Sequence, residues 1–468
     1  MAEIIFPAAV LLAAFLAAWS ILLGAVGGLR ITRTLPQGAM HYFFLALILS
    51  NGLAVLVSTR NFSLTGEFFD TQLTANPVAS WSIRLTSLLA LIASADQIAR
   101  RLRIRAHPGG ERLMLAFALL LFWTGNIVIP TLFSAHRAQP QLSWVYAPIV
   151  GAGLVLMTPE AGRRCLDYSR NALIVFCAVS LLLIIARPSL VLQTDYTQGY
   201  LGIPRFAGLA PHALTMGLVA CVGIWCLLTR PLQSKFNQRV ALAICLLALF
   251  LAQSKAIWIS LILTSPILIF NRIKLPSFNE IASSRYRGLI ITAVLLIAVA
   301  LIGLVAALAL GGFDQKLSKL MASDEGSRIM SFTGRDRIWE VALNEWHKAP
   351  IFGYGIPLFG AEHQIQIAMP FATSGHNQLI DTLGRSGLIG ASTLVLYTGC
   401  LLYMGIRYGR ASRGLSAVLV IAIVIRMISE VPLNMATVGL ESIAHYLLLV
   451  SIAIGAPLRQ ARAAGLAR

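Results

Sequence analysis

Two short segments of this sequence combine residue types that could act on a phosphate and on a hydroxyl group. The first, Thr333-Gly334-Arg335-Asp336-Arg337-Ile338-Trp339-Glu340, predicts a helix start, because Thr333 and Asp336 have the spacing of a capping box. Arg335 then falls in the first turn, where free backbone N–H groups and the helix dipole favour anions. A guanidinium at this place suits a phosphate group. Pairing of Arg335 with Asp336 or Glu340 is the structural alternative.

The second segment is Ser374-Gly375-His376-Asn377-Gln378-Leu379-Ile380-Asp381. Ser374 is the expected cap of a short helix, which puts His376 near the helix start. Histidine is the side chain best suited to take a proton from a hydroxyl near neutral pH. The chain has eight histidines, and a single histidine is more often structural. This segment therefore leaves both the catalytic and the structural reading open.

The elements that must position these segments are membrane helices. Of 468 residues, 57% are apolar and only 12% are charged, which excludes a water-soluble enzyme, a disordered chain and a coiled coil. The sequence predicts an all-α polytopic membrane protein with about 12 or 13 transmembrane helices. The expected spans are 4–29, 40–58, 81–99, 113–135, 143–159, 171–188, 208–229, 240–252, 256–270, 288–311, 387–406, 414–432 and 439–456.

The formal net charge of +18 is mostly a signal of topology. With the N-terminus outside, most Lys and Arg residues fall in loops on one side, as expected for cytoplasmic loops, and nucleic acid drops out as a partner. Three units follow: an N-terminal transmembrane bundle of about ten spans (1–311), a long helical outer loop (312–386), and C-terminal transmembrane helices with a cytoplasmic tail (387–468). The run 240–270 must fold back at Gln253-Ser254-Lys255, because cations flank both of its ends.

These loops place three cations, Arg205, Lys255 and Arg335, at one membrane face around the loop that carries His376. Such a cluster suits a polyanion anchored in the outer leaflet, namely a lipid pyrophosphate. Each cation also has a structural reading, such as snorkelling of Lys255 to the interface. Arg426 and Glu430 form an expected i, i+4 pair in the twelfth span, either structural or functional. No cysteine or histidine spacing indicates a metal site, so neither metal nor cofactor is expected.

At this point the residues resemble a family. Gly334-Arg335-Asp336-Arg337-Ile338-Trp339 followed by Pro350-Ile351-Phe352-Gly353-Tyr354-Gly355 is similar to the signature of the bacterial O-antigen ligase and polysaccharide polymerase superfamily. So is His376-Asn377 followed by Leu383-Gly384-Arg385-Ser386-Gly387-Leu388-Ile389-Gly390. The segments 205–212 and 253–258 match weaker patterns in the same order, so the resemblance covers roughly residues 200 to 435.

The resemblance implies a GT-C-like, metal-independent, inverting glycosyltransferase of the bacterial inner membrane, with its active site facing the periplasm. Its donor would be an undecaprenyl-pyrophosphate-linked glycan and its acceptor a second glycan. Membrane lipids and chain-length regulators or export proteins would be further partners. His376 would activate the acceptor hydroxyl, Arg335, Lys255 and Arg205 would bind the pyrophosphate, and Arg426, Glu430 and Asn377 would support the site.

Three functions remain open on the sequence. Ligases of this superfamily usually have Arg where this chain has Lys255, and the Gln-Ser-Lys pattern favours an exopolysaccharide polymerase that joins lipid-linked repeat units. The alternative is an O-antigen ligase that transfers the glycan to lipid A core. A flippase for the same lipid-linked sugars is the rival from another class, although no inverted repeat supports it. An inactive membrane scaffold would lack a cavity shared by Arg335, Lys255 and His376.

Overall fold

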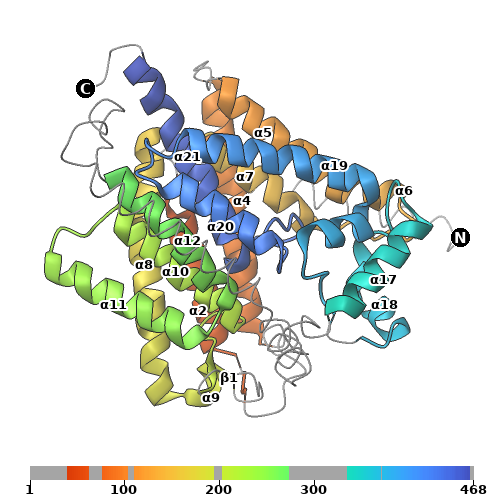
Figure 1. Cartoon of the computed structure of the whole chain (residues 1–468), viewed down its shortest axis with the longest axis horizontal. Coiled ribbons are helices and arrows are strands. Elements are labelled where there is room, and N and C mark those ends of the chain that lie inside the picture. Colours follow the sequence, from red (N-terminus) through yellow and green to blue (C-terminus); the bar gives the residue numbers. More distant parts are fainter. Residues whose placement is uncertain are drawn as a thin grey trace, which may run out of the picture.

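The computed structural model describes residues 39–58, 60–62, 76–103, 110–193, 203–272, 335–369 and 372–463 (Figure 1). Within the first half, the helices are η1 (Met40–Tyr42), α2 (Phe43–Leu56), α4 (Pro77–Arg103), α5 (Gly110–Trp123), the π-helix η2 (Thr124–Val128), α6 (Ile129–Phe133), η3 (Leu142–Val145), α7 (Tyr146–Val155), α8 (Pro159–Ala186) and α9 (Pro188–Val191). Those of the second half are α10 (Ala213–Thr229), α11 (Lys235–Ala252), α12 (Lys255–Arg272), α17 (Arg335–Lys348), η6 (Ile356–Phe359), α18 (Ala361–Gln366), α19 (Gln378–Arg407), α20 (Leu415–Met427), η7 (Leu440–Ser442) and α21 (Ile443–Ala463). The strands β1 (Leu192–Gln193) and β2 (Arg205–Phe206) pair antiparallel.

The helices match the spans that the sequence predicts. Five of them in the described residues are long and apolar enough to cross a membrane: Pro77–Arg101, Gly110–Phe133, Pro159–Ala186, Lys235–Ala252 and Gln378–Arg407. The other expected spans between 40 and 270 and between 387 and 456 coincide with shorter apolar helices. The all-α, multi-pass membrane architecture is therefore confirmed. The expected spans 4–29 and 288–311 lie outside the described residues.

One helix starts well before its predicted apolar run. α8 begins at Pro159 rather than at 171, because Thr158 caps it by accepting a hydrogen bond from the Ala161 backbone N–H at 3.1 Å. Proline at the first position and Glu160 in the first turn both favour a helix start. The polar turns before residue 171 thus extend the helix beyond its apolar part.

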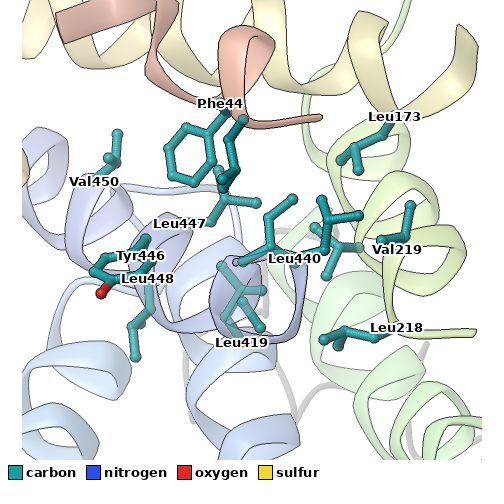
Figure 2. Close-up of a cluster of buried hydrophobic side chains, with 14 of the residues drawn as sticks. Phe44, Leu173, Leu218, Val219, Leu419, Leu440, Tyr446, Leu447, Leu448 and Val450 are labelled. Carbon is teal, nitrogen blue, oxygen red and sulfur yellow. The ribbon is translucent and has the colours of Figure 1, made fainter. Parts of the chain in front are cut away.

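The core of the bundle is built around α10, which is buried along almost its whole length. It packs against α8, α11, α12, α20 and α21. Figure 2 shows Leu218 and Val219 of α10 facing Leu173 of α8 and the cluster of Leu419, Leu440 and Leu447. Small residues permit this close packing, as is common between membrane helices: a Cβ on Gly217 would lie 2.9 Å from the Ser254 Cβ. Large apolar side chains such as Ile185 and Ile262 point outward, as lipid-facing residues should.

The predicted fold-back after α11 is confirmed. α11 ends at Ala252, Gln253 adopts a left-handed conformation (φ 51°), and α12 begins at Lys255. The Gln253 side-chain amide donates to the Ile203 carbonyl at 3.0 Å, which joins this turn to the segment that leads into β2. The turn and the strand with Arg205 therefore form one surface.

The described part of the long loop 312–386 is largely helical and packs onto the start of α19. In Figure 1, α17 and α18 lie together beside α6 and the beginning of α19. α19 is broken at Gly387, whose backbone is non-helical (φ 61°, ψ −158°). This residue is also where the expected boundary of the outer loop falls.

The break in α19 explains the glycine-rich motif of residues 350–355. The kink frees the carbonyls of Gly384 and Arg385, which accept from the N–H groups of Tyr354 and Gly355 at 2.8 and 3.0 Å. In return, the N–H of Leu388 donates to the Pro350 carbonyl at 2.9 Å. A Cβ at Gly353 would lie 2.5 Å from the Arg385 carbonyl carbon, so only glycine fits. These backbone bonds fix α17 relative to α19.

Candidate functional site

Arg335 is the first residue of α17, close to the predicted helix start at Thr333, which lies outside the described residues. Its guanidinium Nη2 lies 3.6 Å from Oε1 of Glu430. Within the described residues it forms no ion pair with Asp336 or Glu340, so the alternative pairing along its own helix is not adopted. Arg335 instead faces a residue that follows α20.

Two contacts hold α17 in this position. The Trp339 indole N–H donates to the Gly375 carbonyl at 2.8 Å, directly before His376. Ala342 is fully buried against Gly384, where a Cβ would lie 3.2 Å from the Ala342 Cβ. Trp339, the tryptophan of the Gly-Arg-x-x-x-Trp pattern, thus connects α17, which begins with Arg335, to the turn that carries His376.

His376 sits in a sharp turn rather than inside a helix. Its φ is 46°, in the left-handed region, and the Gly375 N–H before it donates to Asp381 Oδ1 at 2.8 Å. The cap of the following helix is Asn377, whose side chain accepts from the N–H groups of Leu379 and Ile380. The expected cap at Ser374 is therefore wrong. Asn377, rather than Ser374, lies directly before the first turn of the helix. Its side-chain amide also donates to the Ile428 carbonyl at 3.2 Å.

Glu430 joins the two predicted segments. One of its oxygens faces Arg335, and the other lies 3.9 Å from Nδ1 of His376, longer than a direct hydrogen bond. Burial raises the pKa of Glu430, but nearby His376, Arg426 and Arg335 outweigh that effect and leave the pKa below its ordinary value. Glu430 is therefore a carboxylate at neutral pH.

Arg426 does not form the expected ion pair with Glu430. The Glu430 N–H donates to the Arg426 carbonyl at 2.7 Å, and the buried Arg426 guanidinium reaches the Glu441 carbonyl at 3.4 Å. Within the described residues, the basic side chains that approach the Glu430 carboxylate within 4 Å are those of Arg335 and His376. The i, i+4 spacing predicted an ion pair between Arg426 and Glu430. The turn after α20 instead directs the Glu430 side chain toward Arg335, which is farther away in the sequence.

His212 connects the Arg205 segment to this group. It caps α10 by accepting a hydrogen bond on Nδ1 from the Leu214 N–H at 3.2 Å. Burial is the main cause that lowers its pKa to about 4; the charges of Arg205, His376 and Arg60 act in the same direction, and Glu430 opposes them. Arg205, His376 and Glu430 are thus all near enough to act on the same imidazole.

The side chain of Arg60 holds the segment between Arg205 and His212 in place. Its role was not predicted from the sequence. Its buried guanidinium donates to the carbonyls of Leu190, Ala210 and Gly208, with Nε to Leu190 at 2.9 Å. Burial lowers its pKa to about 9, so it stays cationic at neutral pH. A single arginine in a short loop carries no pattern that could have identified it.

Lys255 lies at the turn between α11 and α12, at the tip of the helix hairpin. It begins α12, and α12 packs against α20, the helix that leads to Glu430. The turn before it is bonded to Ile203, two residues from Arg205. The structure therefore groups Arg335, His376, Glu430, His212 and Arg205, while a cavity shared by Lys255 and His376 stays a prediction.

These contacts define a class: a multi-pass helical membrane protein with arginines, a histidine and a carboxylate converging at one end of the bundle. Residues 240–395 match the family model described as O-antigen ligase. The match covers a third of the chain, includes Lys255, Arg335 and His376, and confirms that the chain is related to the O-antigen ligase and polymerase superfamily. A search of curated proteins found no match.

Proposed function

We propose that this protein is a periplasmic-face glycosyltransferase of the bacterial inner membrane that polymerises undecaprenyl-pyrophosphate-linked repeat units. The observation that carries the proposal is the convergence of Arg335, Glu430 and His376 from three separate segments. A site of this kind combines a cation for a departing pyrophosphate with a base for an attacking hydroxyl.

In the proposed reaction, an acceptor hydroxyl oxygen attacks the anomeric carbon of the donor sugar. The new C–O bond forms as the bond to the pyrophosphate oxygen breaks, and the lipid pyrophosphate leaves with the electron pair. His376 takes the hydroxyl proton, and a single displacement inverts the anomeric centre. Arg335, with Arg205 and Lys255, stabilises the charge of the leaving group.

Glu430 supports both halves of this chemistry. Its carboxylate faces Nδ1 of His376, so it can stabilise the imidazolium that forms when the ring takes a proton on Nε2. In the ligand-free protein it also balances Arg335. A pyrophosphate bound to Arg335 would balance the charge of the guanidinium in place of Glu430. Glu430 could then interact with His376 alone.

The ligase alternative also has support, because the matching family model is described as O-antigen ligase. Gln253-Ser254-Lys255 favours the polymerase. We expect purified, reconstituted protein to lengthen the glycan when it receives only a lipid-linked repeat unit. Transfer that requires added lipid A core would establish the ligase instead.

A control distinguishes both reactions from transport. A flippase would move the lipid-linked repeat unit across a vesicle membrane without changing its chain length. Movement of that kind, with no new glycosidic bond in the presence of either acceptor, would overturn the proposed activity.

A further inference from the structure

A cavity of about 100 Å³, lined by both polar and apolar side chains, lies beside the His376 turn. Its walls come from the π-helix η2, the residues before His376, the first turns of α19 and the segment after Glu430. That volume is several times the roughly 10–15 Å³ that one buried water needs, so several hydroxyl-sized groups fit. η2 contributes Asn126, and π-helical turns of this kind often occur at functional sites.

The lining of this cavity is charge-balanced. Its two charged residues, Asp381 and Arg385, pair with each other at 3.1 Å. Arg385 also donates to the carbonyls of Ile356 and Thr373, and Asp381 accepts from the Gly375 N–H. These groups satisfy one another, so the cavity offers no net charge to an anion.

The other lining residues are uncharged, and they include both hydrogen-bonding side chains and apolar ones such as Leu433 and Met435. Gln378 and Thr382 are buried there, and Asn434 lies on the opposite segment. Asn434 Oδ1 accepts from the Ala436 N–H at 2.8 Å, and within the described residues its amide NH₂ has no hydrogen-bond acceptor. Neutral donors and acceptors of this kind suit the hydroxyls of a sugar.

The position of the cavity indicates whether it would hold the donor sugar or the acceptor sugar. Ser374 and Gln378, on either side of His376, line it, and Val431 after Glu430 lines it as well. His376 itself is not among the lining residues, so the cavity lies next to the turn that carries the base, whereas Arg335 approaches Glu430 from α17. In a direct displacement, the attacking hydroxyl enters from the side opposite to the leaving group and next to the base.

We propose that this cavity binds the acceptor glycan, an uncharged sugar whose hydroxyl is presented to His376. The assignment rests on the proposed glycosyl transfer. It separates two parts of the substrates by chemistry: the pyrophosphate of the donor binds at the arginines, and the sugar that carries the attacking hydroxyl of the acceptor binds at the charge-balanced cavity.

Two substitutions test the assignment without touching His376, Glu430 or the arginines. Ala436→Leu places an apolar side chain at the cavity wall. Asn434→Asp keeps the oxygen that accepts from the Ala436 N–H and replaces the amide donor with an oxygen. Thr437→Leu is the matched control, because Thr437 is exposed and is not among the cavity-lining residues.

The experiment measures two quantities on each reconstituted protein. Binding of undecaprenyl pyrophosphate reports the donor site and the folded state. Transfer at varied concentrations of the free repeat-unit oligosaccharide reports the KM for the acceptor. We expect Ala436→Leu and Asn434→Asp to raise that KM about tenfold or more, with undecaprenyl pyrophosphate binding and the Thr437→Leu control unchanged.

An unchanged acceptor KM in either variant that still binds undecaprenyl pyrophosphate would overturn the acceptor assignment while leaving the proposed function intact. Loss of undecaprenyl pyrophosphate binding in both variants would also overturn it, because the cavity would then belong to the donor site. Failure of the wild-type protein to transfer any sugar, by contrast, would overturn the proposed function itself.

Discussion

Two neighbouring regions at one end of the bundle differ sharply in charge. Around Glu430, one carboxylate faces Arg335 and His376, and Arg426 is near enough to lower its pKa, so cations are in excess. In the adjoining cavity, Asp381 and Arg385 neutralise each other. The first region suits a polyanion and the second an uncharged sugar, although residues 374–385 contribute to both.

This difference predicts which kinetic constant each substitution changes. Changes among the cations should alter the use of the donor, and changes at His376 should alter the chemical step.

Replacing His376 should have the largest effect. His376→Ala removes the proposed general base, so kcat should fall about 100-fold to 10,000-fold while donor binding remains. Initial rates of glycan extension at saturating donor check this. His347→Ala on α17 is the control, because His347 is exposed and should leave the rate unchanged. A His376→Ala protein with nearly normal kcat would show that another group accepts the proton.

Arg335→Ala should weaken the donor interaction. A charged hydrogen bond to the pyrophosphate contributes about 1.5–3 kcal/mol, so the donor KM should rise about 10-fold to 150-fold. The neighbouring Arg337→Ala is a matched control, because Arg337 is exposed on the same turn and contacts no carboxylate within 4 Å in the described residues. Equal effects of the two substitutions would mean that only the general charge of the loop matters.

Glu430→Gln keeps the size of the side chain but removes the charge between the two regions. We expect kcat to fall about tenfold, because the His376 imidazolium loses its carboxylate partner, while the donor KM stays level or decreases as Arg335 is released. Glu340→Gln, an exposed change on α17, is the control. A rise in the donor KM without a change in kcat would assign Glu430 to donor binding instead.

Two substitutions of Lys255 distinguish the contribution of its charge from that of its side-chain geometry. Lys255→Arg should retain most of the activity, whereas Lys255→Ala should raise the donor KM several-fold, about as expected for one recessed cation. Steady-state rates at varied donor concentration distinguish the two. If both variants behave like the wild type, Lys255 lies outside the donor site.

His212 should make stability depend on pH. Its pKa is lowered to about 4 from an ordinary 6.5, so between these values the unfolded chain binds more protons than the folded one, and stability falls as the pH falls. The melting temperature in detergent should therefore drop from pH 7 to pH 4.5. His212→Asn keeps a side-chain cap and should reduce that drop. An identical drop in both proteins would assign it to other groups.

The sequence predicted the architecture well because apolar runs and cation placement follow directly from the membrane. It also singled out Arg335 and His376, whose side chains the structure brings to the same carboxylate, since helix starts and proton-accepting side chains have local signatures. It did not predict that Glu430 pairs with Arg335 rather than with Arg426, because the turn after α20 sets that direction. Arg60 and the cavity beside His376 depend on contacts between distant segments, which no local spacing reveals.

The central claim is that a sugar leaves a lipid pyrophosphate at the Arg335–Glu430–His376 site. Its most direct test is the amount of undecaprenyl pyrophosphate released from a lipid-linked repeat unit by reconstituted wild-type, His376→Ala and His347→Ala proteins. We predict equal numbers of released undecaprenyl pyrophosphate molecules and new glycosidic bonds in the wild type and in His347→Ala, and about 100-fold to 10,000-fold slower formation of both in His376→Ala. New glycosidic bonds in His376→Ala at the wild-type rate, or none in the wild type, would contradict the account.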